Sequence, residues 1–172
     1  MPTPSKSQLL NQLHGLRNSG FADKLKQHAT ANNLPTQFFF GIASRETNCR
    51  NILGDQINGQ FHGVGIVQID IQHPIARTAR DNGTWKTNPD PLLEFGAQML
   101  AGNLKLARQK FPTLTAEQQL KIAASGYNCG MGNAVTGQQQ FGDSDKRTTG
   151  HDYGRDVLNR MAVFAELISE GN

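Results

Sequence analysis

Cysteine is scarce in this chain, and its scarcity excludes one class of protein. The 172 residues include two cysteines, Cys49 and Cys129. Two cysteines form at most one bridge, whereas small domains that depend on disulfides carry many more. The chain is therefore no disulfide scaffold, and its length is sufficient for one domain with a core of its own. The two thiols are either bridged or free.

Charge of one sign and long apolar runs are also in short supply. The formal net charge is +3, and no cluster of lysines and arginines alternates with aromatic residues, so we expect no nucleic-acid binding. No stretch is long enough to cross a bilayer, so we expect no membrane insertion. The opening MPTPSKSQLLNQL lacks the segments of an ordinary secretory signal, which predicts either another export route or earlier removal of a signal.

Motifs that would indicate a cofactor or an activated nucleophile are missing. The five histidines show no His-x-x-x-His spacing, and the cysteines show no Cys-x-x-Cys spacing. Neither a phosphate-binding glycine loop nor a Gly-x-Ser-x-Gly elbow occurs. A thiol nucleophile built from Cys49 with His62 or His73 has no support in the local sequence. We therefore expect neither a metal ion nor an organic cofactor.

Helical spacing of apolar residues dominates the chain and predicts one mainly α domain over residues 1–172, expected to be a monomer. Ser5 with Gln8 and Thr115 with Gln118 fit the capping box that opens a helix. The glycine-rich stretch 51–85 predicts a loop or small-strand region in which GVGIVQID is extended, and the polar stretch 135–150 predicts a loop. Helices are expected at 5–30 with a break at Gly20, from Pro35 to Asn48, at 91–110, from Thr115 to the turn CGMGNA, and at 152–169.

One apolar stretch ends in a charged pair. Wound as a helix, LPTQFFFGIAS would present a broad apolar arc that packs inside the protein, and Arg45 and Glu46 follow it. A carboxyl group half buried at such a place has a raised pKa, which a general acid working near neutral pH requires. The alternative is that Glu46 pairs with Arg45 or another cation, or lies at the helix surface.

Two aspartates accompany Glu46 in the glycine-rich region. These are Asp55 and Asp70, and Asp70 would project from the end of a strand because it ends the run GVGIVQID. Two carboxyl groups in unlike environments are the arrangement that glycoside hydrolysis uses, one protonating the leaving oxygen and one activating water. Taken alone the pattern is weak, because any chain of this size has carboxylates near glycines.

Five segments make the pattern specific. SRETN, GVGIVQID, GTWKTNP, KFPTLTAEQQLKIAASGYNCGMGNA and HDYGRDVLNRM, in this order and at these spacings, closely resemble goose-type lysozymes, which are relatives of the soluble lytic transglycosylases. The resemblance covers about residues 34–170 and leaves 1–33 as an N-terminal helical segment. It implies an α+β lysozyme-like fold with a substrate cleft. It also implies action at the cell wall, periplasmic or extracellular, on the β-1,4 bond between N-acetylmuramic acid and N-acetylglucosamine in peptidoglycan.

The resemblance also implies roles for individual residues. Glu46 matches the catalytic acid of the family, and Asp70 matches an aspartate that holds the attacking water during hydrolysis with inversion. Asp55 matches a second such aspartate less closely. Further residues expected to bind substrate are Tyr127, Asn128, Tyr153, Gln68 and His73, although the tyrosines could be core residues and His73 part of a solvated loop.

Several alternatives stay open. The lytic transglycosylase branch generally lacks the two aspartates and leaves an anhydro sugar, so their presence favours hydrolysis. Some bacterial members act on chitin, and a non-catalytic wall-binding module would use the same cleft without needing a half-buried acid. Cys49 and Cys129 stand where the family usually has small residues, and a bridge between them is a hypothesis. Trp85 would either stack on a sugar or anchor the packing.

Overall fold

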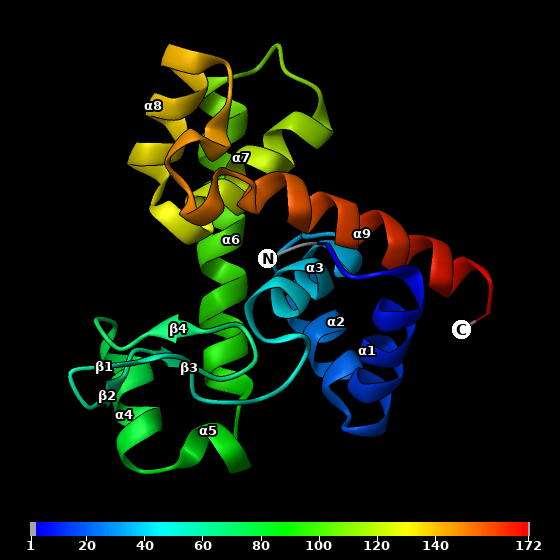
Figure 1. Ribbon diagram of the computed structural model, residues 1–172, viewed down its shortest axis with the longest axis vertical. Helices are drawn as coiled ribbons and strands as arrows, with labels where there is room; N and C mark the ends of the chain where they lie inside the picture. Colours follow the sequence, from blue (N-terminus) through cyan, green and yellow to red (C-terminus); the bar gives the residue numbers. More distant parts are fainter. Residues whose placement is uncertain (1–2, 172) are drawn as a thin grey trace.

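The computed structural model describes residues 3–171 of the chain. Helices dominate, with two small antiparallel sheets at one end (Figure 1), which confirms the expected mainly α fold with a small strand region. The helices are α1 (Lys6–Asn18), α2 (Phe21–Ala31), α3 (Thr36–Thr47), α4 (Pro74–Asp81), α5 (Thr84–Thr87), α6 (Asp90–Lys110), α7 (Ala116–Cys129), α8 (Met131–Phe141) and α9 (Tyr153–Ser169). The strands are β1 (Gln56–Ile57), β2 (Gln60–Phe61), β3 (Gly63–Val64) and β4 (Ile69–Asp70), and the 3-10 helices are η1 (Ser144–Arg147) and η2 (Thr149–His151).

The N-terminal helices begin and end where the sequence places caps. Ser5 and Gln8 form both hydrogen bonds of the predicted capping box at the start of α1. Gly20, with φ 74°, separates α1 from α2, because the left-handed conformation suits glycine. Helix α3 follows Pro35 and ends at Asn48, whose φ of 52° leaves the helical region. The predicted break and the predicted bounds of this helix are confirmed.

Helices α3 and α9 cross in the core. The three phenylalanines of α3 are buried, and the ring of Phe40 packs edge-on against Phe164 of α9 with centroids 5.8 Å apart. Gly41 allows a close crossing, because a Cβ atom there would lie 2.8 Å from the carbonyl oxygen of Val157. The apolar arc predicted from the sequence therefore faces the core, and it fixes the position of Glu46 one turn further along.

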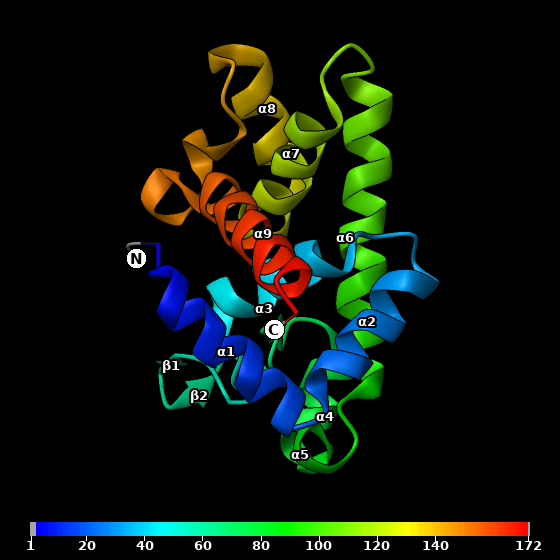
Figure 2. The same ribbon diagram turned by 90° about the vertical axis from the view of Figure 1, so that its right-hand side faces the viewer.

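Helix α6 lies along the long axis of the molecule (Figures 1 and 2). The strands, α4 and α5 gather at one of its ends, and α7 and α8 gather at the other, while α2 and α3 lie beside its middle. Within residues 3–171, no helix combines the length and the apolar character that crossing a bilayer would need. The cleft residues expected from the sequence come from elements at both ends of α6.

The run GVGIVQID is not extended throughout, contrary to the prediction. Strands β3 and β4 pair Gly63 with Asp70 and Val64 with Ile69, and the residues between them form a turn. Gly65 has φ 81° in this turn. The apolar residues of the turn are buried, so they resemble a strand in sequence although the backbone folds back. Asp70 does end a strand, as expected.

Two helices lie where the sequence predicted loops. Helix α8 begins at Met131, within the predicted turn CGMGNA, and continues into the first part of 135–150 as far as Phe141, and α4 lies within 51–85. Their buried residues are small, Ala134 and Gly137 in α8 and Ala76 and Ala79 in α4. At Gly137 a Cβ atom would lie 2.8 Å from the carbonyl oxygen of Asp143. Helices packed through small residues lack the stripe of large apolar residues on which the prediction depended.

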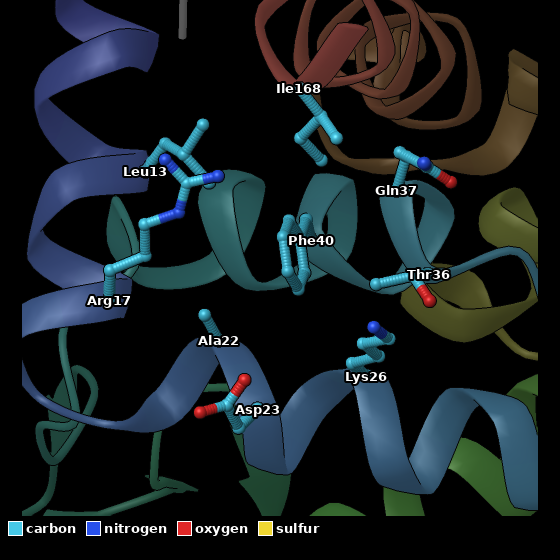
Figure 3. A pocket seen from close by; sticks show the side chains of 9 residues that line it. All are labelled: Leu13, Arg17, Ala22, Asp23, Lys26, Thr36, Gln37, Phe40 and Ile168. Atoms are coloured by element: carbon cyan, nitrogen blue, oxygen red, sulfur yellow. The ribbon is translucent and has the colours of Figure 1, made fainter. Parts of the chain in front are cut away.

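A cavity of about 260 Å³ lies among α1, α2, α3 and the end of α9 (Figure 3). Leu13, Phe40 and Ile168 form its apolar part, and Asp23 and Lys26 lie at its polar side. None of the residues to which the sequence assigns a function lines it. The candidate site is therefore elsewhere.

Candidate active site

A cavity of about 450 Å³ opens between the last turn of α3, the segment before β1 and the start of α9. Glu46 is half-buried in its wall. Five of the residues expected from the sequence share this cavity, although they are far apart in the chain. They are Glu46, Asp55, Gln68, Asn128 and Tyr153, and the rest of the lining is Arg45, Ile52, Leu53, Gly54, Thr149 and Gly150.

Glu46 has the perturbed pKa that the sequence predicted. Burial raises the pKa of its carboxyl group from 4.5 to about 7, against the opposing effects of the Tyr153 hydroxyl and the Arg45 charge. The Tyr153 hydroxyl donates a short hydrogen bond to Oε1 of Glu46. A carboxyl group with a pKa near 7 is protonated in about half of the molecules at neutral pH. Glu46 can therefore donate a proton into the cavity.

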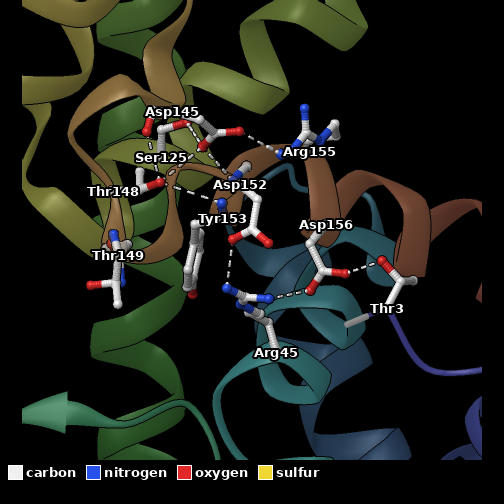
Figure 4. Close-up of polar contacts among 12 residues, drawn as sticks. Thr3, Arg45, Ser125, Asp145, Thr148, Thr149, Asp152, Tyr153, Arg155 and Asp156 are labelled. Carbon is white, nitrogen blue, oxygen red and sulfur yellow. Dashed lines mark hydrogen bonds and ion pairs between the residues drawn. The ribbon is translucent and has the colours of Figure 1, made fainter. Parts of the chain in front are cut away.

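Arg45 faces α9 and does not form an ion pair with Glu46. Its Nη1 donates to Oδ2 of Asp156 at 2.8 Å, and its Nη2 donates to Oδ1 of Asp152 at 2.9 Å (Figure 4). The guanidinium carbon also lies 5.4 Å from the centre of the Tyr153 ring. Among the described residues Glu46 forms no ion pair with Arg45 or with another cation, and it is half-buried in the cavity wall instead of lying at the helix surface. The arginine instead joins α3 to the start of α9.

The two tyrosines approach Glu46 from different helices. Tyr127 of α7 donates its hydroxyl to the carbonyl oxygen of Val67 at 2.8 Å, and Tyr153 of α9 donates to Glu46. Burial, and then the charge of Glu46, raise the pKa of both phenols well above the ordinary value. Both therefore stay neutral hydrogen-bond donors. Tyr127 holds the turn between β3 and β4, and Tyr153 contacts the acid itself.

Asp70 lies in an adjoining cavity of about 420 Å³. Its Oδ1 accepts the backbone N–H of Gln72 at 2.7 Å. His73 lines the same cavity at the N-terminus of α4, and its ring packs against Phe95 with centroids 4.8 Å apart. Asp55 lines the cavity of Glu46, whereas Asp70 does not. The residues shared by both cavities are Gln68 and Asn128, and those lining only the second include Asp70, His73 and Tyr127.

The side chain of Gln68 occupies the space beside two glycines of this region, Gly54 and Gly63. Its side-chain amide donates to the carbonyl oxygens of Ile52 at 3.1 Å and of Gly65 at 2.7 Å. A Cβ atom at Gly54 or at Gly63 would lie 2.0 Å from Oε1 of Gln68. The side chain therefore fits between two stretches of backbone that approach closely because both residues are glycine.

The segment 149–150 is a part of the site that the sequence analysis missed. Oδ1 of Asn128, at the end of α7, accepts the backbone N–H of Thr149 at 2.9 Å. Gly150 has φ 77° and brings the chain around to Asp152 and Tyr153. The glycine within TTGHDY is a local signal for such a turn. Its contact with Asn128 depends on the tertiary fold.

The bridge between Cys49 and Cys129 is absent, and both cysteines are free thiols. Cys49 is part of the main core, whereas Cys129 packs on a separate cluster between α6, α7 and α8. Burial raises the pKa of Cys49 to about 12 and also raises the pKa of Cys129. The two motifs do line one site, but their cysteines point into different clusters.

Trp85 anchors the packing and does not line either cavity. It is 9% exposed in the short helix α5, and its carbonyl oxygen accepts a hydrogen bond from Nδ2 of Asn51 at 2.9 Å. Of its two expected roles, the packing role is the one observed. Within residues 3–171, no group of three or more histidine, cysteine or acidic side chains is placed to hold a metal ion.

Comparison with known proteins gives a consistent result. A family model described as Lysozyme g matches residues 7–167, so the match includes the N-terminal helices that lay outside the sequence resemblance. Lysozyme g of Casuarius casuarius is 34% identical over 126 residues, which cover 73% of this chain and 62% of that protein. For lysozyme g of Gallus gallus the values are 32% over 126 residues, covering 73% and 54%. For lysozyme g of Epinephelus coioides they are 33% over 130 residues, covering 72% and 63%.

These alignments span between 54% and 63% of the length of the three relatives. The family model nevertheless extends over most of the chain and includes every element of both cavities. This chain belongs to the lysozyme g family.

Proposed function

We propose that this protein is a muramidase, which hydrolyses the β-1,4 bond between N-acetylmuramic acid and N-acetylglucosamine in peptidoglycan. The observation that carries the proposal is the carboxyl group of Glu46, whose pKa is raised to about 7 in the wall of a cavity. Membership of the lysozyme g family supports the same reaction class. Such a substrate is outside the cytoplasmic membrane, so the protein would work at the cell wall.

Glu46 is the general acid in this proposal. Cleavage of a glycosidic bond requires a proton on the leaving oxygen, and a carboxyl group with a pKa near the working pH supplies it efficiently. The hydrogen bond from Tyr153 fixes Oε1. The proton that Glu46 delivers to the leaving oxygen is then the one on Oε2, the oxygen to which Tyr153 does not donate. The chemistry needs neither a metal ion nor an organic cofactor.

Asp55 and Asp70 are the candidates for activating water. Hydrolysis with inversion places the second carboxylate roughly 6.5–9.5 Å from the acid, with room for a water between them. Asp55 lines the same cavity as Glu46, which supports it more directly. Asp70 lines the adjoining cavity beyond Gln68. We assign Asp55 to the water and retain Asp70 as a second carboxylate that assists it.

The two cavities together would accommodate a polymer of several sugars. Gln68 and Asn128 line both, so a glycan that passes from one cavity to the other contacts them at the junction. Tyr127 and His73 line the second cavity, where an aromatic ring and hydrogen-bond donors suit an acetylated sugar. These residues, with Tyr153, form the proposed substrate contacts.

The decisive experiment is mass spectrometry of the soluble products from purified peptidoglycan, with a chitin oligomer in parallel. We expect muropeptides that end in a reducing sugar. Anhydro ends, lighter by one water, would identify a lytic transglycosylase and remove the water-holding role of the aspartates. Cleavage of chitin alone would keep the acid and change the substrate. Glu46→Gln is expected to lower turnover by at least about a hundredfold. Its binding to cell walls, measured by co-sedimentation, is expected to remain the same as that of the wild type. Wild-type binding without products would indicate a wall-binding module.

A further inference from the structure

Asp145 is a fully buried carboxylate behind the wall of the candidate site. It belongs to η1, and its side chain is 1% exposed. Neither cavity of the site includes it. A buried carboxylate is costly unless hydrogen bonds or charges compensate for the lost water. The partners of Asp145 therefore indicate what its burial stabilises.

The first partners of Asp145 are the backbone N–H groups that open α9. The N–H of Gly154 donates to Oδ1 at 2.6 Å, and the N–H of Arg155 donates to Oδ2 at 2.9 Å. The first N–H groups of a helix have no partner inside the helix and need an external acceptor. Asp152, which precedes α9, makes no side-chain cap. Asp145 therefore caps α9 from another part of the chain, where a negative charge also suits the helix dipole.

Thr148 completes this arrangement at Tyr153. Its Oγ1 donates to the carbonyl oxygen of Asp145 at 3.0 Å and accepts the N–H of Tyr153 at 3.4 Å (Figure 4). The first three N–H groups of α9 thus all find acceptors in Asp145 and Thr148. Tyr153 is the first residue of that helix, and its hydroxyl contacts Glu46.

The same carboxylate also contacts α7. Oγ of Ser125 donates to Oδ1 of Asp145 at 2.9 Å. Ser125 precedes Tyr127 and Asn128 on this helix. At Gly154 a Cβ atom would lie 2.5 Å from Oγ of Ser125, so α7 and α9 approach closely at this point. One buried group therefore joins the two helices that carry the tyrosines of the site.

Charged groups near Asp145 are few. Nζ of Lys121 lies 3.8 Å from Oδ2 of Asp145 and 2.7 Å from Oδ1 of Asp143, so the lysine is closer to the other aspartate. Oδ1 of Asp143 also accepts the backbone N–H of Asp145 at 3.0 Å. The start of α9 thus supplies the shortest hydrogen bond to the Asp145 carboxylate, at 2.6 Å, and a second one at 2.9 Å, equal in length to the bond from Ser125.

We propose that Asp145 is a positioning residue, which fixes the first turn of α9 and so holds the hydroxyl of Tyr153 on Glu46. A contribution of Asp145 to catalysis depends on the proposed function, whereas its effect on the hydrogen bond between Tyr153 and Glu46 does not. Glu46 is faced by Tyr153 from α9, by Arg45 from α3 and by Tyr127 from α7. Of these, Tyr153 makes the contact that Asp145 controls.

Asp145→Asn tests the proposal sharply. Both carboxylate oxygens accept backbone N–H groups, so whichever way the new amide turns, its NH₂ group faces a donor. The first turn of α9 must then move. Because the Tyr153 hydroxyl lowers the pKa of Glu46, withdrawing it is expected to raise that pKa above its value of about 7. Carboxyl-carbon NMR titration of glutamate-labelled protein measures this directly.

Matched variants give the comparison. Tyr153→Phe is expected to raise the pKa of Glu46 in the same direction as Asp145→Asn. Glu117→Gln removes an equal charge from an exposed position of α7, away from Asp145 and α9, and is expected to leave that pKa unchanged. Thr148→Val keeps the shape of the side chain and removes the acceptor of the Tyr153 N–H, so it provides the same test should Asp145→Asn fail to fold. If Asp145→Asn and Thr148→Val both fold and the pKa of Glu46 is unchanged in both, the proposal is overturned.

Kinetics give a second readout. Asp145→Asn is expected to lower kcat/KM by on the order of tenfold and to shift the alkaline limb of its pH profile upward, because misplacing a group at the acid slows the reaction. The double variant with Tyr153→Phe should be no slower than Tyr153→Phe alone. If the losses in kcat/KM of the two single variants multiply in the double variant, the role of Asp145 is merely structural. The same conclusion follows if Asp145→Asn lowers kcat/KM without shifting the alkaline limb of the pH profile. If the wild type cleaves no peptidoglycan, the proposed function fails, and the NMR titration still decides the role of Asp145.

Discussion

Glu46 is held in a state that serves the proposed reaction at the expense of stability. Desolvation at the end of α3 disfavours its charged form, and neither the Tyr153 hydrogen bond nor the Arg45 charge fully offsets this. In the unfolded chain the same carboxyl group has its ordinary pKa of 4.5. Between these two pKa values the folded protein binds more protons than the unfolded chain, so stability falls as the pH rises from 4.5 to about 7.

Glu46→Gln is therefore expected to stabilise the protein at alkaline pH. The difference between the two pKa values corresponds to at most about 3 kcal/mol, which is fully expressed above the folded pKa and disappears below the unfolded one. Urea unfolding near pH 8 and near pH 4 measures the free energies. Glu117→Gln, at an exposed position of α7, is the control and should show no such gain. Equal stability of wild type and Glu46→Gln at both pH values would contradict the burial argument.

At the scale of elements, glycine decides how closely the helices approach. Gly41 lies where α3 crosses α9, and an added Cβ atom would meet the backbone carbonyl of Val157 at 2.8 Å. A backbone atom in the middle of a helix has little freedom to move away. Gly102 lies on the exposed face of α6, where an added Cβ atom has no neighbour within 4 Å. Glycine is therefore required by the packing at position 41 of α3, whereas at position 102 of α6 the packing leaves room for a larger side chain.

Gly41→Ala is expected to destabilise the protein by about 1–3 kcal/mol, because the overpacked crossing must separate. Gly102→Ala is expected to stabilise it by about 0.5–1 kcal/mol, because alanine loses less conformational entropy in a helix interior. Denaturant unfolding of the two variants beside the wild type compares them. If both variants shift the denaturant midpoint of unfolding in the same direction, the close crossing of α3 and α9 does not disfavour a Cβ atom at position 41.

At the scale of the whole molecule, one histidine joins the N-terminal helices to α6. His28 of α2 is 8% exposed, with Nδ1 2.8 Å from Oε2 of Glu94 and Nε2 3.1 Å from Oδ1 of Asp90. Lys24 also pairs with Asp90. The His28 contact lowers the pKa of Glu94, and Lys24, with a smaller effect of His28, lowers that of Asp90. Carboxyl groups with lowered pKa values stabilise the fold above their ordinary pKa, and this stabilisation is lost as the pH falls.

His28→Leu is expected to destabilise the protein at neutral pH by about 1 kcal/mol, the usual net value of such hydrogen bonds. For a domain of this size that is a decrease in Tm of roughly 2–4 °C. The difference from wild type should narrow as the pH falls below about 4, where the two carboxyl groups become protonated. His14→Leu, at an exposed position of α1, controls for the loss of a histidine. A pH-independent difference would mean that packing, and not the carboxylates, explains the effect.

Local sequence determined the features that depend on neighbours within one or two turns. The capping boxes of α1 and α7, the break at Gly20 and the apolar arc of α3 involve residues a few positions apart, and all were predicted correctly. The raised pKa of Glu46 also followed, because it comes mainly from burial at the end of that arc. The small-residue packing of α4 and α8 left no such local pattern, and those helices were missed.

Only the tertiary structure decided how the site is assembled. Tyr153 contacts Glu46 across 107 positions of the chain, and Arg45 contacts Asp156 across 111. The sequence placed Asp70 and Asp55 in one glycine-rich region, but in the structure they line two adjoining cavities that share Gln68. The tertiary structure also places the two cysteines in different apolar clusters. Periodicity reports which face of an element is apolar, whereas the packing of one element on another decides which polar groups meet.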